Sequence, residues 1–253
     1  MTHIRSHQEV EKIRESSRIV YETLQVLKDS VVEGMTGNQL DTLAEEFILS
    51  QGGRPAFKGY MGYTATLCIS INDTVVHGIP DETEFRNCDI VSIDCGVLKD
   101  GYYGDSAHTY VVGKVSDNVQ KLLDVTEQSL NIGIDKARTG NYVSDIGHAI
   151  QTYVEENGFS VVRNLVGHGI GTALHEDPQV PNYGDPGQGI KLKSGMCLAI
   201  EPMVNEGHHE TYTKPDGWSI CTKDGSLSAH FEHTIVVTDD GGTILSNGVY
   251  NGY

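Results

Sequence analysis

The first fifty residues alternate between apolar and polar positions with the period of a helix. Ser6 and Glu9 form a capping box ahead of a long run whose apolar residues share one helical face. Thr36 and Gln39 form a second capping box ahead of a shorter run, which ends at the glycine pair 52–53. The pattern predicts two amphipathic helices in succession.

Strand-like segments follow at residues 66–71, 90–95 and 102–112, and the same order then returns. Ser116 opens a third helical run, and the tripeptide Thr-Gly-Asn at 139–141 repeats the one at 36–38. Corresponding apolar positions follow the two tripeptides: Leu40, Leu43 and Phe47 after the first, and Val143, Ile146 and Ile150 after the second. Strands are expected again at 160–163, 196–201 and 230–238, and an exposed loop or hairpin at 207–225.

A helix–helix–strands unit used twice would explain this order. The alternative is that Thr-Gly-Asn recurs by chance, because it is good helix-start chemistry. We expect an α/β (α+β) fold in which residues 1–253 form a single domain, with internal halves at about 1–115 and 116–253.

Composition narrows the function classes. With 35 acidic and 18 basic residues, the net charge is −17, which argues against nucleic-acid binding. We see neither an apolar leader segment nor a run long enough to span a membrane. The five cysteines are scattered and never spaced as C-x-x-C, so a reducing cytoplasm is the expected compartment.

Two aspartates sit in a segment that otherwise favours strands. A hairpin centred between Lys99 and Asp100 sets Asp94 opposite Asp105, with Cβ atoms roughly 4.5–5.5 Å apart. Two like charges at that distance repel unless they are protonated or bound to a cation. The spacing therefore favours a metal site, although Asp105 alone also suits an ordinary turn.

Three further residues extend this candidate site. His168 lies between glycines in Gly167-His168-Gly169, Glu201 ends an apolar run before Pro202, and Glu232 is expected in the middle of a strand. Each has an ordinary structural explanation, as a loop histidine or an exposed strand end. Together, one imidazole and four carboxylates suit divalent ions such as Mn, Fe or Co, which activate water for amide hydrolysis.

Several motifs now carry a family resemblance. They are Val76-His77-Gly78-Ile79-Pro80, Val91-Ser92-Ile93-Asp94-Cys95-Gly96, Gly104-Asp105-Ser106-Ala107, Gly167-His168-Gly169-Ile170-Gly171, Ile200-Glu201-Pro202 and Glu232-His233-Thr234. In this order they resemble the type I methionine aminopeptidases over nearly the whole chain. The resemblance implies a duplicated pita-bread fold around a curved antiparallel sheet. It also implies removal of the initiator methionine by a hydroxide bridging two metal ions, with a preference for a small second residue.

The resemblance also implies residue roles. Two divalent ions (Co, Mn, Fe, Zn or Ni) would be bound by Asp94, Asp105, His168, Glu201 and Glu232. Asp105 and Glu232 would bridge them, and Glu201 would also move a proton. His77 and His175 would contact the substrate amide and the oxyanion.

A methionine slot is implied at Tyr60, Tyr63, Cys68 and Trp218, with His77 and His175 at its polar end. Phe57 stands where some family members have Cys, and Leu174 stands where Phe is expected. Core or loop packing is the ordinary alternative for the aromatic residues.

Rival classes differ in length and ligands. Proline-specific relatives usually carry a large additional N-terminal domain, and type II enzymes carry a helical insertion, whereas this chain leaves room for neither. Non-catalytic relatives that bind other proteins typically lose metal ligands. We expect nascent polypeptide N-termini as substrates, transient ribosome association and a monomer, with no nucleic acid or membrane as partner.

Overall fold

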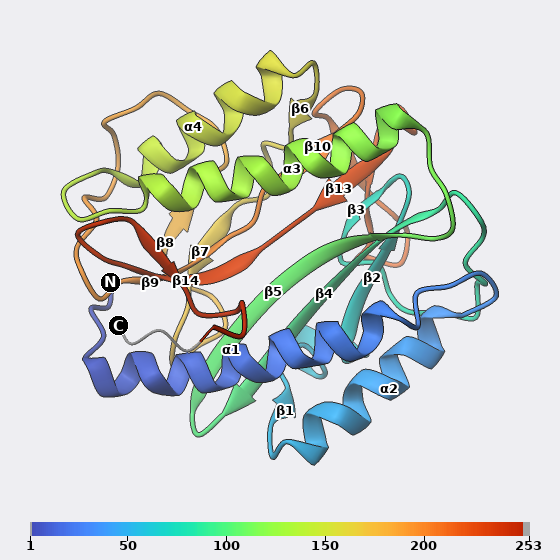
Figure 1. Ribbon diagram of the computed structural model, residues 1–253, viewed down its shortest axis with the longest axis horizontal. Helices are drawn as coiled ribbons and strands as arrows, with labels where there is room; N and C mark the ends of the chain where they lie inside the picture. The colour runs from blue at the N-terminus through green and yellow to red at the C-terminus, as the bar shows by residue number, and fades with distance from the viewer. Residues whose placement is uncertain (1, 250–253) are drawn as a thin grey trace.

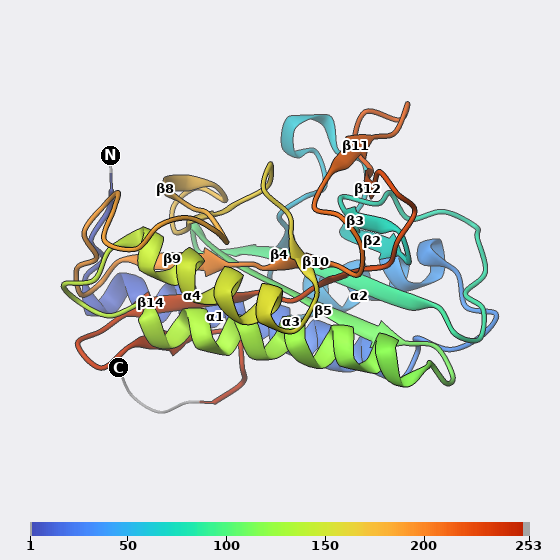
Figure 2. The same cartoon turned by 90° about the horizontal axis from the view of Figure 1, so that it is seen from above.

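The computed structural model describes residues 2–249, which form four helices packed against antiparallel strands (Figure 1). The helices are α1 (His7–Lys28), α2 (Gly37–Ser50), α3 (Asp117–Lys136) and α4 (Val143–Glu156), with one 3-10 turn, η1 (Tyr60–Gly62). Figure 2 shows the helices on one side of the strands and the hairpin of β11 (Thr211–Thr213) and β12 (Ile220–Thr222) projecting on the other. None of the helices within 2–249 is both long and apolar enough to cross a membrane.

The strands form four small antiparallel sheets. In the first half, β4 (Ile90–Lys99) pairs with β1 (Arg54–Pro55), β2 (Leu67–Ile71) and β5 (Tyr102–Val111). In the second half, the five-stranded order is β15 (Gly242–Ile244), β14 (His233–Val237), β9 (Cys197–Ile200), β7 (Gly167–Gly169) and β8 (Glu176–Val180). The smaller sheets are β13 (Ser228–His230), β10 (Met203–Asn205) and β6 (Ser160–Val161), and β11, β12 and β3 (Thr74–Val76).

The sequence patterns explain the helices. Ser6 and Thr36 cap α1 and α2 through the expected capping boxes, and Ser116 caps α3. The buried faces of α2 and of α1 from Ile19 onward pack into one apolar cluster around β2 and β4, which includes Leu40. The face of α3 and α4 packs into a separate cluster, which includes Ile146. Each half thus has a main core of its own, and a smaller cluster joins the start of α1, at Ile13, to the second half.

The repeat is real, but its expected register is wrong by three residues. Helix α4 starts after Tyr142 rather than after Thr139, and the Asp145 carboxylate accepts the N–H of Tyr142 at 2.7 Å. Asp145 therefore plays the part of Gln39 in α2. The buried residues correspond accordingly: Leu40, Ala44 and Ile48 in α2 match Ile146, Ile150 and Val154 in α4.

Side-chain hydroxyls join the two halves where β5 meets the segment 228–237. The Thr234 hydroxyl donates to the Asp105 carbonyl at 2.7 Å and accepts the Asp105 N–H at 3.0 Å. From the first half, the Thr109 hydroxyl donates a hydrogen bond to the His230 carbonyl at 2.8 Å. The same hydroxyl accepts a hydrogen bond from the His230 N–H at 2.9 Å. Both threonines are buried, so these bonds fix the backbone of the seam without water.

Replacing Thr234 with Val keeps the shape of the side chain but leaves the Asp105 N–H and carbonyl without this partner. We expect the metal-free protein to lose about 2–6 kcal/mol of unfolding free energy, because each of the two buried unpaired groups costs about 1–3 kcal/mol. Urea unfolding measures the change. Thr152→Val, on the exposed face of α4, is the matched control, and equal losses in the two variants would contradict the role given to Thr234.

Candidate metal centre and its pocket

The hairpin of β4 and β5 brings Asp94 and Asp105 to one face, but not directly opposite each other. Asp100 and Gly101 adopt positive φ angles of 50° and 81°, so these two residues form the turn of the hairpin. Asp94 then pairs with Ala107, and Asp105 with Gly96. The expected pairing is therefore wrong by two residues, because the centre of the hairpin lies one residue later than expected. Strand β4 also extends beyond the expected end at 95, and the two carboxylates are diagonal neighbours on one face.

Glu201 and Glu232 face each other across an interruption in the second half. Ile200 pairs with His233 and Met203 with His230, so the same register sets Glu201 opposite Glu232. Pro202 lacks an N–H and cannot continue the ladder here. The expected mid-strand position of Glu232 is therefore wrong: Glu232 lies between β13 and β14, and its N–H bonds to the Ala107 carbonyl of β5 at 3.0 Å.

His168 enters the centre from β7. Its neighbours must be glycine, because a Cβ at Gly167 would lie 2.4 Å from the Ala199 carbonyl oxygen. His168 Nδ1 lies 2.9 Å from the Gly169 carbonyl oxygen, which can only accept a hydrogen bond. Nδ1 therefore carries the proton, and the Nε2 lone pair is free to bind a cation. That nitrogen lies 3.4 Å from Glu201 Oε1.

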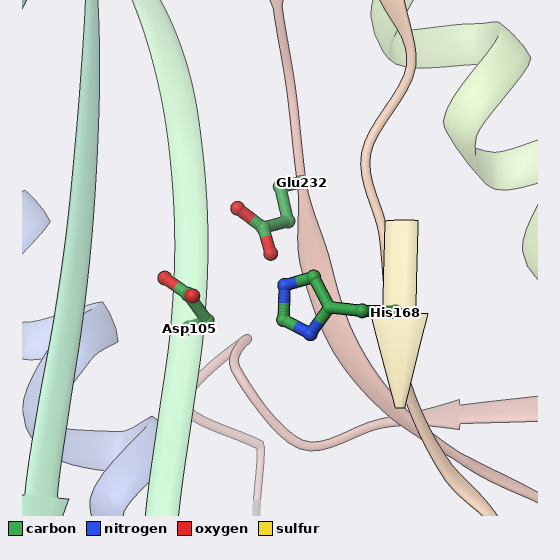
Figure 3. A group of neighbouring side chains, drawn as sticks. All are labelled: Asp105, His168 and Glu232. Atoms are coloured by element: carbon green, nitrogen blue, oxygen red, sulfur yellow. The ribbon is translucent and has the colours of Figure 1, made fainter. Parts of the chain in front are cut away.

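Side chains from three separate segments converge on one point. Figure 3 shows Asp105 on β5, His168 on β7 and Glu232 beside β14 directed toward one another, and their nearest ligand atoms lie within 4.8 Å. All three are buried, with exposed fractions of 3%, 8% and 2%. Asp94 and Glu201 are partly buried beside them.

Burial of four like charges perturbs every carboxyl group. Burial raises the pKa of Asp94 to about 7. Burial and then the neighbouring carboxylates raise the pKa values of Asp105, Glu201 and Glu232 well above their usual range. Within residues 2–249, Asp94 Oδ1, Asp105 Oδ1 and Glu232 Oε1 are buried without a hydrogen-bond partner. Unpaired oxygen atoms and one neutral imidazole fit divalent cations.

A cavity of about 190 Å³ opens beside this cluster. Every site residue expected from the sequence lines it: Phe57, Tyr60, Tyr63, Cys68, His77, Asp94, Asp105, His168, Leu174, His175, Glu201, Trp218 and Glu232. One end is therefore charged and the other apolar. The structure brings the expected set together around one space.

The apolar end is closely packed. The Tyr63 and Trp218 rings meet edge to face, with centroids 5.0 Å apart, and Leu174 is buried against the same cluster. The Phe57 ring covers Gly96, where a Cβ would lie 2.6 Å from the ring. Phe57 and Leu174 thus both wall the slot.

Two histidines stand at the polar end. His77 adopts φ 59°, a conformation that is unfavourable for a non-glycine residue and is often retained at functional sites. Burial lowers the pKa of His77 to about 4, so its ring is neutral at pH 7. Desolvation also lowers the pKa of His175.

Sequence reasoning missed Met61, which lines the cavity, and His230, which lies beside the carboxylate cluster. Met61 lies at the mouth of the cavity, 82% exposed, with φ 48°. His230 is buried, and its Nε2 lies 3.9 Å from Glu201 Oε2 with no hydrogen-bond partner in the described part of the chain. The only signal for His230 was its position two residues before Glu232.

The fold and the site together define a class of protein with a candidate metal centre that is assembled from both halves of a duplicated chain. The model of "Metallopeptidase family M24" matches residues 11–239. The chain therefore belongs to metallopeptidase family M24, and its similarity within that family is to the methionine aminopeptidases.

The relatives are similar over nearly their full length. "Methionine aminopeptidase 1" of Bacillus subtilis is 52% identical, with 92% of this chain and 94% of that protein covered. "Methionine aminopeptidase" of Clostridium perfringens is 50% identical, with 96% and 98% covered. The crystal structure of methionine aminopeptidase from Rickettsia prowazekii has a TM-score of 0.96 at 43% identity, covering 97% of this chain and 100% of that one. The expected resemblance and the pita-bread fold are confirmed.

The proline-specific rival shares only the fold. The prolidase from Pyrococcus horikoshii has a TM-score of 0.79 at 21% identity. This chain covers 65% of that one. The length difference agrees with the additional domain expected for such relatives.

Replacing Glu232 with Gln should stabilise the metal-free protein, because an amide cannot ionise among the neighbouring carboxylates. We expect a gain of about 1 kcal/mol or more, which corresponds to about 2–4 °C in melting temperature per kcal/mol. The pKa of Glu232 is raised on folding, so the wild type loses stability as pH rises above about 4, the unfolded value. The gain should therefore grow with pH.

Thermal unfolding of the metal-free proteins between pH 4 and 8 measures this effect. Glu46→Gln, on the exposed surface of α2, is the matched control and should leave the melting temperature unchanged. Added Mn²⁺ should raise the melting temperature of the wild type more than that of Glu232→Gln. A variant that is less stable than the wild type at pH 8 would contradict the assignment.

Proposed function

We propose that this protein removes the N-terminal methionine from polypeptides by metal-dependent hydrolysis, with a preference for a small second residue. The observation that carries the proposal is one cavity that joins an apolar slot to the carboxylate–histidine cluster. The whole cavity measures about 190 Å³, below the range of about 300–1,000 Å³ typical of drug-sized ligands, so it suits one residue at a chain end. A flexible thioether packs well against the aromatic and thiol walls.

The ligand set supports two divalent ions, drawn from Co, Mn, Fe, Zn and Ni. Asp105 and Glu232 would serve both ions, Asp94 would serve one of them, and His168 with Glu201 would serve the other. Bound ions would polarise the scissile carbonyl and lower the pKa of a water molecule that attacks it. The bound cations would then compensate the repulsion between the carboxylate oxygens that the two halves bring together.

The chain's own groups supply the remaining steps. Glu201 stands at the edge of the cluster with its side chain 14% exposed, so it can accept a proton from the attacking water and deliver it to the leaving amine. His77 and His175 are neutral and line the same space, where each can donate one hydrogen bond to the substrate amide or to the oxyanion. The slot holds the methionine side chain so that its carbonyl reaches these donors.

The proposed substrates are nascent polypeptide N-termini. We also propose that the enzyme acts as a monomer in the cytoplasm and associates transiently with ribosomes, as the family resemblance implies. Residues 1–253 would form one catalytic domain, because the centre takes ligands from both halves.

Hydrolysis of three peptides tests the proposed function. We expect cleavage of Met-Ala-Ser only after Mn²⁺ or Co²⁺ is added to the metal-free enzyme, with little cleavage of Leu-Ala-Ser or Ala-Pro-Ser. Equal cleavage of the leucine peptide would show a slot without methionine selectivity. Cleavage of Ala-Pro-Ser alone would move the chain to the proline-specific branch.

His175→Ala tests the division between metal binding and chemistry. His175 is not among the assigned ligands, so the variant should retain both ions. Its kcat should fall about 10²–10³-fold, the typical loss on removing one oxyanion donor. Metal content after dialysis and steady-state kinetics measure the two effects, with exposed His208→Ala as the control. Loss of metal from His175→Ala would contradict this assignment.

A further inference from the structure

Tyr60 lines the slot, but its hydroxyl group points to a second role. We propose that the Tyr60 hydroxyl fixes the neutral tautomer of His175, so that His175 Nε2 carries the proton and donates to the substrate oxygen. The inference rests on the proposed function. It makes Tyr60 a positioning residue that acts through His175.

Two adjacent histidines in this site need opposite tautomers. The His168 and His175 rings lie nearly perpendicular, at 72°, with centroids 4.3 Å apart. His168 donates through Nδ1 to the Gly169 carbonyl and so offers Nε2 as a lone pair to a cation. His175 must do the reverse, because an oxygen that gains negative charge needs a donor.

Tyr60 supplies the partner that selects this state. Its hydroxyl oxygen lies 2.8 Å from His175 Nδ1, and the two rings are 5.2 Å apart. Burial raises the pKa of Tyr60, so the phenol keeps its proton. An acidic O–H is a good donor and a neutral imidazole nitrogen is a good acceptor, so Nδ1 accepts. Nε2 is then left as the N–H donor.

The backbone holds both partners in place. Tyr60 opens a tight turn between Gly59 and Gly62, in which Gly59 N–H bonds to the Tyr63 carbonyl at 2.7 Å. His175 lies in a turn that the next residue, Glu176, closes. The Glu176 Oε1 atom accepts hydrogen bonds from the N–H groups of Thr172 and Ala173 at 2.8 and 2.9 Å. The second Glu176 oxygen pairs with Arg5. The Tyr60–His175 contact is thus set by two independently braced turns.

Tyr60→Phe removes only the hydroxyl group and keeps the ring in the slot. We expect kcat for Met-Ala-Ser to fall about three- to tenfold, the range for one net hydrogen bond, while KM changes less than twofold. Tyr103→Phe is the matched control, because Tyr103 packs against the same cluster without lining the cavity. A Tyr60→Phe enzyme with the kcat of the wild type would overturn the proposal.

A double-mutant cycle separates this role from a structural one. If Tyr60 acts through His175, Tyr60→Phe should cause no further loss of kcat in the His175→Ala background. The same loss in both backgrounds would overturn the proposal, because Tyr60 would then act independently.

Nitrogen-15 NMR of metal-free protein with labelled histidine reads the tautomer without any turnover. Wild-type His175 should show a protonated Nε2 and an unprotonated Nδ1, and Tyr60→Phe should mix the two tautomers. A protonated Nδ1 in the wild type would overturn the proposal. This readout holds even if the metal-loaded wild type fails to cleave Met-Ala-Ser, which would instead contradict the proposed function.

Discussion

The centre depends on the seam at which β5 meets the segment between β13 and β14. Within residues 2–249, no continuous ladder of backbone hydrogen bonds crosses this seam. Instead, the buried Thr234 hydroxyl bonds the N–H and the carbonyl of Asp105, and the buried Thr109 hydroxyl bonds the N–H and the carbonyl of His230. The Ser106 hydroxyl adds a bond to the Glu232 carbonyl at 2.5 Å. Because Asp105 and Glu232 both lie on this seam, the separation of their carboxylates is set by neutral hydrogen bonds rather than by their own charges.

Each half contributes a like-charged pair to this seam. The first half brings Asp94 and Asp105 on a hairpin, and the second brings Glu201 and Glu232 across an interrupted ladder. Such a cluster is unfavourable alone and becomes favourable with cations. The apolar slot needs no such compensation, since Tyr63, Leu174 and Phe57 pack as an ordinary core would. The proposed specificity and catalytic groups thus lie in adjoining parts of one cavity with opposite physical demands.

Much of this was readable from the sequence. The capping boxes at Ser6 and Thr36 predicted two helix starts correctly, because the interaction is local. The candidate ligands stood out by type, since carboxylates in apolar strands are rare without a reason, and the structure brings them together around one cavity. The errors lay where tertiary structure decides. Asp100 adopts a left-handed conformation that shifts the hairpin, and the Asp145 side chain caps α4 at Tyr142, three residues after the start that Thr139 had indicated. No local pattern could place Glu232 outside a strand, because the deciding hydrogen bond runs from its N–H to the Ala107 carbonyl of β5, which is far away in the sequence.

The two main cores have a consequence for how the protein is made. Each half buries a main apolar cluster of its own, so that of the N-terminal half can collapse while the rest is still being synthesised, before the smaller shared clusters form. The proposed ligand set would stay incomplete until Glu232, in the second half, has been synthesised and docked. Metal uptake would then follow synthesis of the second half, because the first half alone would present two unneutralised aspartates.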